Sequence, residues 1–572
     1  MKKIFKSNII VALVALILTL CACEDFLNRP SEDQYTIDGF FQTDEQCYQA
    51  ANILYNSPWY DFQRMFTRID ILAGNEYYGI TDAYQTFAVT ANDQFLQTAM
   101  ASPWEVNAHA NAVIENVANL AGPDVSQAVK NTVTGEAMTW KALAYFYLVR
   151  LWGAVPIIHN NTEIVGAGTA NDLYKIRVED IYEYIIRTLR KAATLLPEEN
   201  LDGRLNKYSA YGLLSKVFLT ASGYGQTGTR DQNYLDSAKY YAGKVINEYT
   251  GTLEPVYSNL FRISTGNYNS ECLITWRWVI SLTTWTSQNT LQADLALGGN
   301  FTQVGDGWGS YTGPTIDLQR LYNDSALSLT RNNTDVRRKA TCMMYGDYYP
   351  YFWRDHGGFT ATFINDATDE VNNPAATTFG SNTGAQNVKH IVGNTADHEA
   401  EDGGVSSANM RTNLATHVLR LADVYLIYAE AVLGNNASTT DAEALRVYNA
   451  VKRRSIPSWS DATSITFRDI FDERRRELAI EGDNWFDYVR LSYYNPTLAI
   501  QMIEAQDRGG YDNAQLREYY AGTRDMEDVT YTPDHVNIDA SDFTLPFPDI
   551  DVNLNPHLLE DPVPFDFSTI DY

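Results

Sequence analysis

Aromatic side chains gather in three short stretches of the sequence, each of which also carries side chains that form hydrogen bonds. The stretches are 75–87, 276–311 and 348–358. Tyr and Trp combine a flat apolar ring with a polar tip, which suits surfaces that are partly wet. A sugar ring has the complementary character, because it presents apolar C–H faces and a rim of hydroxyl groups. The candidate ligand-binding residues are therefore Tyr77, Tyr78, Asp82, Tyr84, Trp285, Trp308, Tyr311, Trp353 and Arg354.

Trp308 is the strongest of these candidates. Glycines flank it in the stretch GDGWGS (305–310), and no predicted element would bury it there. The stretch lacks the Lys-Ser/Thr pair that grips a phosphate, so we interpret it as a flexible loop that displays Trp308. By contrast, Trp276 and Trp278 alternate along an apolar, strand-like piece, and core packing is expected for at least one of them. Trp104 is also expected to be structural.

Two clusters of charged residues could serve either as catalytic acids or as ion pairs. Their members are Arg420, Asp423, Glu430, Glu473, Arg474, Glu477 and Glu481. A pair of carboxylates can act as general acid and base. Carboxylates three or four residues from arginines on one helix, however, are usually held ionised as ion pairs. We therefore predict a scaffolding role for both clusters and assign no catalytic residue.

Signals for a metal ion or a cofactor are weak. The eight histidines are scattered, and neither H-E-x-x-H nor C-x-x-C occurs. The stretch 549–560 has oxygen ligands at the spacing of an EF-hand loop, but Leu554 stands where the loop requires Gly, and no helices are predicted beside it. Those oxygen ligands are Asp549, Asp551, Asn553, Asn555 and Glu560. We predict no cofactor and interpret this stretch as an extended tail rather than a calcium site.

The N-terminus has the pattern of an export signal. Lysines at 2, 3 and 6 precede an apolar run from Ile9 to Leu20, which is too short to cross a bilayer. Leu20-Cys21-Ala22-Cys23 resembles a bacterial lipobox, with Cys23 as the lipidated residue. An acyl anchor gains about 0.8 kcal/mol per buried methylene, so several chains on one cysteine hold a domain firmly at a membrane. The acidic residues Glu24 and Asp25 resemble the signal that sends such lipoproteins to the cell surface in the Bacteroidetes.

Composition narrows the possible partners. The 572 residues carry a formal net charge of −28, which becomes −31 once the three lysines of residues 1–22 are removed. So acidic a chain repels phosphate backbones, and nucleic acid is therefore not an expected partner. Four cysteines remain after residue 22, too few for a disulfide-stapled scaffold.

Helical periodicity occurs in both halves of the chain. Apolar residues at helical spacing predict helices over 136–151, 178–196, 207–221, 234–248, 419–433, 441–454, 467–480 and 484–492. Neighbouring helices with short connections resemble the hairpins of helical-repeat proteins, in which each hairpin needs a neighbour to cover its apolar side. We therefore predict an all-α fold of tetratricopeptide-like helical pairs, although the strict tetratricopeptide consensus is absent.

The region between these helical segments has a different character. From about 251 to 415, Gly, Asn, Thr and aromatic residues dominate, and only short strand-like pieces remain. So long a stretch without regular structure usually carries function. The predicted organisation is a signal peptide at 1–22, a helical-repeat region at 23–250, a loop-rich, ligand-facing region at 251–415, and a helical region with an extended tail at 416–572.

Seven stretches, taken in order, resemble the SusD/RagB family of outer-membrane nutrient-binding lipoproteins and cover nearly the whole mature chain. They are CEDFLNRPSEDQYT (23–36), GEAMTWKALAYFYLVRLWGAVPII (135–158), GRLNKYSAYGLLSKVFL (203–219), NLFRISTGNYNSECLITW (259–276), HVLRLADVYLIYAEAV (417–432), ERRRELAIEGDNWFDYVRL (473–491) and LPFPDIDVNLNPHL (545–558). Lys452 and the pair Asp483-Asn484 depart from the family, which commonly has Arg at these positions.

The resemblance implies a SusD-like fold of helical pairs with an irregular, loop-rich face. It implies a non-catalytic receptor that captures oligosaccharides at the cell surface. The expected partner is a SusC-like TonB-dependent outer-membrane transporter, over which the lipoprotein lies as a hinged lid. With the lipobox, the expected location is the cell outer membrane, through a lipid anchor at Cys23.

Two other functions remain open at this stage. A surface glycoside hydrolase would use two of the many carboxylates beside aromatic residues, which in retaining enzymes lie about 5–5.5 Å apart. An interaction scaffold would instead capture a peptide or protein on the concave side of its helical pairs.

Overall fold

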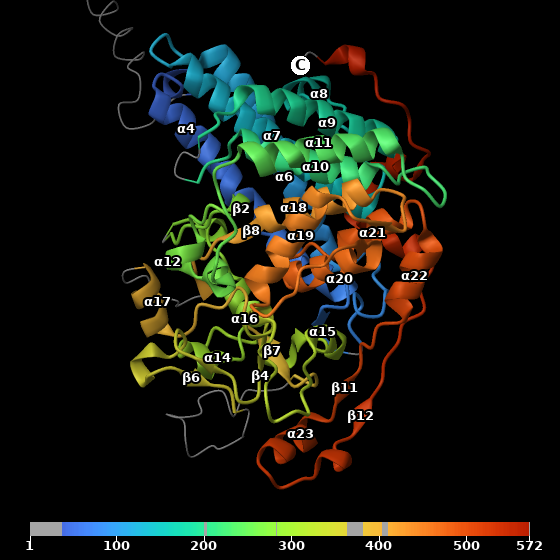
Figure 1. The fold of residues 1–572 in the computed structure, drawn as a ribbon. Coiled ribbons are helices and arrows are strands. Elements are labelled where there is room, and N and C mark those ends of the chain that lie inside the picture. Colours follow the sequence, from blue (N-terminus) through green and yellow to red (C-terminus); the bar gives the residue numbers. More distant parts are fainter. Residues whose placement is uncertain are drawn as a thin grey trace, which may run out of the picture.

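The computed structural model describes residues 37–79, 81–199, 203–281, 283–362, 381–402 and 410–570. The predicted signal and the lipidation site Cys23 lie outside these residues. In Figure 1 the long helices fill the upper part of the molecule, and the irregular region with its short strands fills the lower part. None of the described helices combines the length and the apolarity needed to cross a bilayer.

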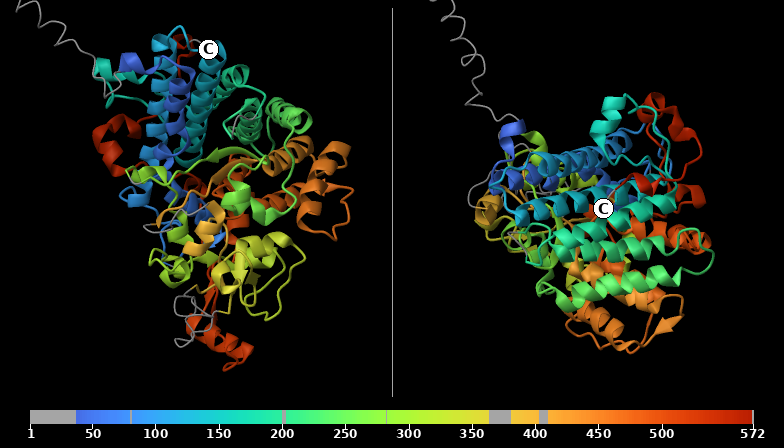
Figure 2. Two further views of the ribbon diagram at one scale, coloured as in Figure 1. Left: turned by 90° about the vertical axis from the view of Figure 1, so that its left-hand side faces the viewer. Right: turned by 90° about the horizontal axis from the view of Figure 1, so that it is seen from above.

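Long helices packed against one another form the frame of the molecule (Figure 2). They are α6 (Gln94–Leu120), α7 (Gln127–Trp152), α9 (Val178–Leu195), α10 (Lys207–Ala221), α11 (Gln232–Glu248), α18 (Leu421–Leu433), α19 (Ala442–Ser455) and α20 (Phe467–Leu478). From α6 to α19, each helix of this series packs on the next. Since α11 packs on α18, the irregular region is an insertion between two neighbouring helices of one stack.

The helices predicted from periodicity are present, with some differences at their ends. The helix predicted over 136–151 is the longer α7, which ends at Trp152, just before Gly153, where φ is +71°. The helix predicted from 419 begins at Leu421, because Thr416–Arg420 forms strand β8, which pairs with β2 (Cys272–Trp276). The short helix predicted near 484–492 is α21 (Trp485–Ser492). In the predicted extended tail, Asp549–Leu554 forms helix α24 rather than part of a twelve-residue ion-binding loop.

The helices before residue 121 were not predicted from the sequence. They include α4 (Asp44–Asn52), α5 (Phe62–Leu72) and α6. Helix α6 contains Pro103, a residue that removes one helical hydrogen bond and interrupts the usual sequence signal. Trp104 follows in the middle of this helix and packs edge-to-face on Tyr145, with 5.9 Å between ring centroids. Its expected structural role agrees with this packing.

One large apolar core joins the helices of both halves of the chain. Trp59 stacks on Trp276 with ring centroids 5.1 Å apart, and it also contacts Trp140. Trp276 and Trp278 are both buried, so core packing is confirmed for both. A second, smaller core surrounds Phe301 in the irregular region and also includes residues of the C-terminal region, such as Leu516. All sheets among the described residues are two-stranded and antiparallel.

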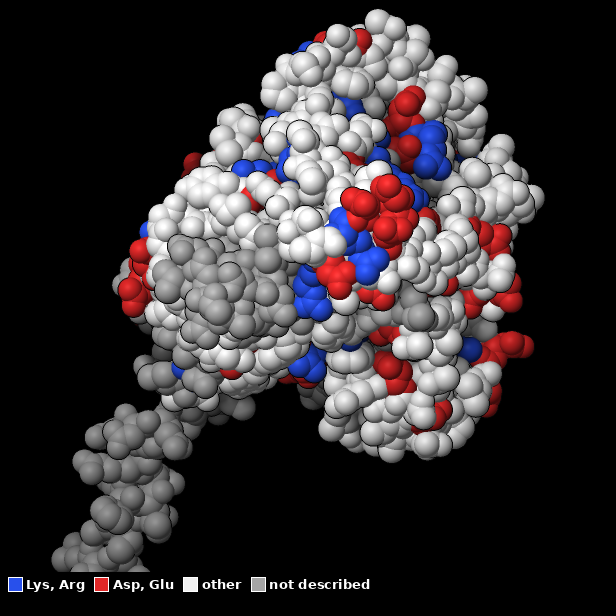
Figure 3. Space-filling view, turned by 90° about the horizontal axis from the view of Figure 1, so that it is seen from below, with Lys and Arg blue, Asp and Glu red and all other residues white. Residues whose placement is uncertain are grey.

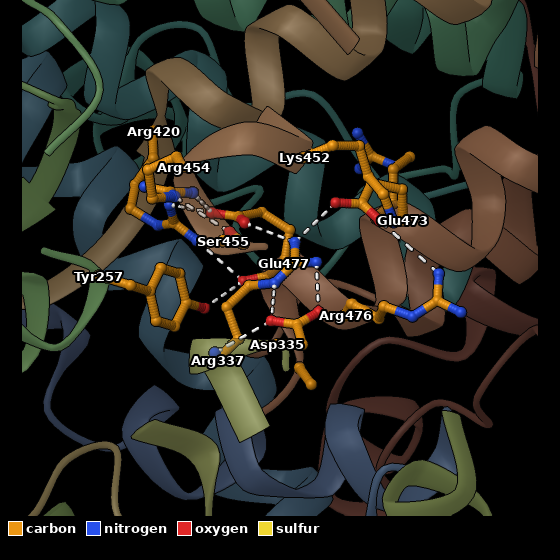
Figure 4. A network of polar contacts seen from close by, with 12 residues as sticks. Tyr257, Asp335, Arg337, Arg420, Lys452, Arg454, Ser455, Glu473, Arg476 and Glu477 are labelled. Carbon is orange, nitrogen blue, oxygen red and sulfur yellow. Dashed lines mark hydrogen bonds and ion pairs between the residues drawn. The ribbon is translucent and has the colours of Figure 1, made fainter. Parts of the chain in front are cut away.

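A buried ion-pair network joins the irregular region to the helical stack (Figure 4). At its centre the Arg420 guanidinium donates to Glu271 at 2.7 Å, to Glu477 at 2.9 Å and to Glu481 at 2.8 Å. Burial raises the pKa of Glu481, but Arg420 and Lys389 outweigh it and lower that pKa to about 2. The carboxylate therefore remains ionised inside the protein.

The irregular region contributes Arg337 to the same network, from α16 (Val336–Thr341). Its guanidinium donates to Glu473 at 2.7 Å and to Glu477 at 3.0 Å. Lys452, one of the departures from the family pattern, also donates to Glu473 at 2.8 Å. The lysine thus supplies the cation needed at this position.

The remaining signature residues form a second buried network. Arg474 donates to Asp487 at 2.9 Å and also pairs with Asp423. Asp483, the other departure from the family pattern, accepts from Arg474 at 3.2 Å. Glu430 accepts from Arg490 at 2.7 Å. These contacts agree with the predicted scaffolding role of both charged clusters.

Replacing Arg420 by Leu should destabilise the fold strongly. The change leaves three carboxylates buried without their shared cation, and breaking a buried ion pair in this way costs about 3–5 kcal/mol. The free energy of unfolding should be measured by denaturant titration. The matched control is Arg453→Leu, which removes an exposed pair with Asp461 and should change stability by no more than about 1 kcal/mol. Equal effects of the two substitutions would contradict the central role of Arg420.

Candidate functional site

Helix α5 carries one edge of a surface on which the exposed aromatic candidates meet. Tyr60 lies two residues before the first residue of the helix, and Arg64 and Arg68 follow at spacings of four residues, so all three lie along one side of it. Segments from the irregular region pack against this side. We call the resulting surface the aromatic strip, and its rings are Tyr60, Tyr78, Trp285, Trp308 and Tyr311.

A short strand pair brings Tyr78 and Tyr311 together. Strand β1 (Glu76–Tyr77) pairs with β3 (Gly313–Pro314), and Tyr78 and Tyr311 lie beside these two strands. Their rings meet edge-to-face with centroids 5.1 Å apart, and the Tyr311 hydroxyl donates to the Tyr78 hydroxyl at 2.9 Å. Tyr311 remains 43% exposed, so part of this residue is accessible to a ligand.

Trp308 is held in place rather than carried on a loose loop. Its backbone N–H donates to the carbonyl of Ala293 at 3.0 Å, and its indole N–H donates to Asp294 at 3.0 Å. A Cβ at Gly309 would lie 2.6 Å from the Asp294 carbonyl oxygen, so this glycine permits the close approach to α13 (Leu291–Leu295). The residue remains 38% exposed. The alternating glycines therefore serve close packing as well as display.

Trp285 completes the strip beside the start of α5. Its indole N–H donates to the Tyr60 hydroxyl, and the residue is 42% exposed. The segment is fastened to α5 by Gln63, whose amide accepts from the Thr290 N–H at 3.1 Å and donates to the Gln288 carbonyl at 3.3 Å. Tyr60 was not a sequence candidate, because α5 itself was not predicted.

Charged groups connect the rings of the strip. Arg64 lies 3.7 Å from Asp294, which also accepts from Trp308. The buried Arg68 guanidinium lies 4.2 Å from the centroid of the Tyr78 ring, a cation–π contact that fixes the ring from behind. The strip thus alternates flat rings with hydrogen-bonding groups. Arg64 and Asp294 carry no sequence signal of their own and are recognised only through these contacts.

Three of the sequence candidates lie in the core instead. Tyr77, Tyr84 and Trp353 are each at most 4% exposed, and the Trp353 indole N–H donates to the Phe301 carbonyl at 2.8 Å. The Tyr84 hydroxyl donates to Asp93 at 2.8 Å. Their rings have no free face for a ligand, so they are not part of the strip.

The two charged candidates make local contacts. The Asp82 carboxylate accepts from the backbone N–H groups of Tyr84 and Gln85, at 2.9 Å and 3.1 Å, and so shapes its own turn. Arg354 pairs with Glu401 in another part of the irregular region. Neither residue contacts the strip rings in the contacts described.

The arrangement of metal-ligand side chains and the distribution of surface charge are two further features of the described residues. Among the described residues, no group of three or more His, Cys, Asp or Glu side chains is arranged to hold a metal ion. On the face seen from below, acidic and basic side chains are interspersed and no continuous basic surface is visible (Figure 3).

Comparison with known proteins identifies the family. Residues 278–563 match the model of the SusD family, and residues 25–219 match one described as starch-binding and associating with the outer membrane. A SusD-like protein of Bacteroides ovatus is 34% identical over 99% of this chain and 100% of its own length.

Solved structures agree with this result. One crystal structure, of a protein with a xylogluco-oligosaccharide, is 32% identical, has a TM-score of 0.76 and covers 91% of this chain and 99% of its own. Surface glycan-binding protein A of Bacteroides thetaiotaomicron, in complex with laminarihexaose, shares the fold at 18% identity, with a TM-score of 0.63 and coverage of 90% and 98%. Sequence and fold agree over nearly the whole length, and the chain belongs to the SusD family.

Proposed function

We propose that this protein is a cell-surface lipoprotein that binds oligosaccharides through the aromatic strip and delivers them to a SusC-like TonB-dependent transporter. The observation that carries the proposal is the strip itself, in which exposed rings from distant segments are held in place on a SusD-family fold. Trp285, Trp308 and Tyr311 supply platforms for the apolar faces of sugar rings.

The physical character of the strip supports a neutral oligosaccharide as ligand. Each ring platform contributes about 0.5–1.5 kcal/mol beyond the area that it buries, so one sugar unit is bound modestly and several together more firmly. Arg64 and Asp294 stand between the rings, where their polar atoms can reach sugar hydroxyls. A hydroxyl of the wrong stereochemistry would leave these groups unpaired, and that cost is the source of specificity.

A catalytic role receives less support from the same geometry. Asp294 is engaged by Trp308 and Arg64, and Asp82 by backbone N–H groups. A glycoside hydrolase needs a carboxylic acid free to protonate the leaving oxygen. We therefore propose binding without catalysis, and no cofactor. The interaction scaffold would use the helical stack and would not need exposed rings.

Trp308→Ala should weaken glycan binding roughly tenfold, because it removes one platform and its buried area. The measurement is isothermal titration calorimetry of the soluble protein lacking residues 1–23 against a panel of neutral oligosaccharides. Trp308→Phe should retain part of the affinity, since it keeps a flat ring.

The matched control is Tyr240→Ala, which removes an aromatic residue that is even more exposed than Trp308, from the distant helix α11. It should leave the affinity unchanged. Absence of any binding by the unmodified protein across the panel would count against glycan binding. Release of reducing ends during incubation would favour the hydrolase instead.

Cys23→Ala should abolish the membrane anchor. The lipobox pattern supports lipidation of this residue, whereas Cys21 has the bulky Leu20 before it and fits poorly. Cells fed labelled palmitate should incorporate label into the unmodified protein and into Cys21→Ser, but not into Cys23→Ala. Surface digestion of intact cells by a protease would report exposure outside the outer membrane. Label retained by the Cys23→Ala protein would overturn the assignment of the anchor.

The transporter partner is testable without knowledge of the glycan. A tagged form of the lipoprotein, extracted from its own cells in mild detergent, should co-purify with a TonB-dependent outer-membrane protein in near-equal amount. Co-purification of the transporter with a protein that binds no glycan would favour the scaffold. Absence of any transporter from a preparation that does bind glycan would remove the delivery step from the proposal.

A further inference from the structure

A large cavity among the described residues is lined by none of the rings of the aromatic strip. Its volume is about 1060 Å³, at the upper end of the range of about 300–1,000 Å³ typical of ligand pockets. Its walls come from α4, from the turn before α5, from α12 (Ile263–Gly266) and from the residues that follow β2. We call it the side cavity. None of the ligand-binding candidates named from the sequence lines it.

The side cavity contains an arginine without an acidic partner. Arg277 is largely buried, its Nε donates to the Gly203 carbonyl at 3.0 Å, and no carboxylate of the described residues pairs with it. Burial lowers the pKa of Arg277, as expected for a guanidinium that has no counter-ion beside it. By comparison, the buried Arg420 is paired with carboxylates, and the buried Arg508 donates to three backbone carbonyl groups. This guanidinium therefore has donor capacity left for a ligand.

An aromatic platform stands over this arginine. The Tyr268 ring centroid lies 4.2 Å from the Arg277 guanidinium, and Tyr268 is 72% exposed. A tyrosine this exposed contributes little to the core, so core packing does not explain why the ring lies here. Amide side chains line the same space, among them Asn413, whose buried Oδ1 has no donor among the described residues. An unsatisfied acceptor of this kind costs about 1–3 kcal/mol, which a ligand hydroxyl can recover.

The charges of the cavity favour a neutral ligand. Its lining holds both signs, with Arg204 and Arg277 on one hand and Glu45, Glu401 and Asp402 on the other. Arg204 is already paired with Glu136, and Glu401 with Arg262. A lining that mixes both signs in this way does not select an acidic or a basic ligand.

The side cavity and the aromatic strip are built on the same short segments of chain. Residues 279 and 280 line the cavity, and the Val279 N–H donates to the Ser287 carbonyl at 2.8 Å, beside Trp285 of the strip. On the opposite wall, Asn56 faces the cavity and donates to the Arg277 carbonyl at 3.1 Å, while Tyr60 contacts Trp285. Asn56 and Tyr60 flank the same short 3₁₀ turn, Ser57–Trp59.

We infer that the side cavity is a second saccharide-binding site, which takes neutral sugar units on the Tyr268 ring with their hydroxyls on Arg277 and the lining amides. The inference rests on the proposed function of the aromatic strip. Two sites on adjoining walls would let one long chain engage both, so that affinity rises with chain length beyond what the strip alone supplies.

The test separates the two sites by substitution. The soluble protein and its Trp308→Ala, Tyr268→Ala and double variants are titrated with a neutral glycan that the unmodified protein binds, in short and long forms. Tyr268 is exposed, so its removal should leave the melting temperature unchanged. For the long form, we expect Tyr268→Ala to weaken binding roughly fivefold or more. The residual binding of Trp308→Ala should be lost in the double variant.

Tyr240→Ala is the control for loss of an exposed tyrosine and should bind as the unmodified protein does. Equal affinity of the Tyr268→Ala and unmodified proteins for long and short chains overturns the second site while leaving the strip intact. The second site is also overturned if Trp308→Ala by itself abolishes all binding, because no residual binding is then left for Tyr268→Ala to remove. A preference for polygalacturonate over neutral chains overturns the proposed ligand class, and failure of the unmodified protein to bind any glycan overturns both proposals together.

Discussion

The pairing of buried, ionised carboxylates with arginines is the constraint on which the rest of this structure depends. Arg420 holds one carboxylate from the irregular region, Glu271, and two from the segment of α20, Glu477 and Glu481, and Arg337 brings the irregular region to two of the acidic residues on α20. Each of these charges would be costly to bury alone, so the segments that carry them must meet. Helical packing assembles the stack, and these pairs determine where the insertion sits upon it. Strand β2, which leads to both candidate binding surfaces, pairs with the strand that ends at Arg420.

Binding surfaces built from irregular segments need such a frame. The rings of the aromatic strip come from residues far apart in sequence, and few regular hydrogen bonds connect them. Their positions depend on single contacts, such as Gln63 to the Gln288 carbonyl and Trp308 to Asp294. These contacts are precise only because α5 is itself embedded in the large core. Loop chemistry on a rigid helical scaffold is thus the general design of the molecule.

The aromatic strip and the side cavity place different demands on a ligand. The strip offers exposed rings with charged groups between them, which suits the faces of successive sugar units. The side cavity surrounds its ligand more fully and offers amides and a guanidinium, which suits the hydroxyl rim. Because Trp285 and Val279 belong to one turn of chain, a change in that turn would alter both surfaces.

The sequence by itself determined the helical stack, the scaffolding role of the charged clusters and the membership of the family. Periodicity and ion-pair spacing are local properties, so α9 and α10 could be placed nearly to the residue. The sequence did not reveal α5, nor α6, in which Pro103 interrupts the helical signal. Only the tertiary structure decided which rings face solvent. Tyr77 and Tyr78 are identical neighbours, yet Tyr77 is buried and Tyr78 joins the strip, because β1 pairs with a strand from the distant irregular region. The burial of a side chain is set by the segments that pack on it, and no local pattern records which distant segments those are.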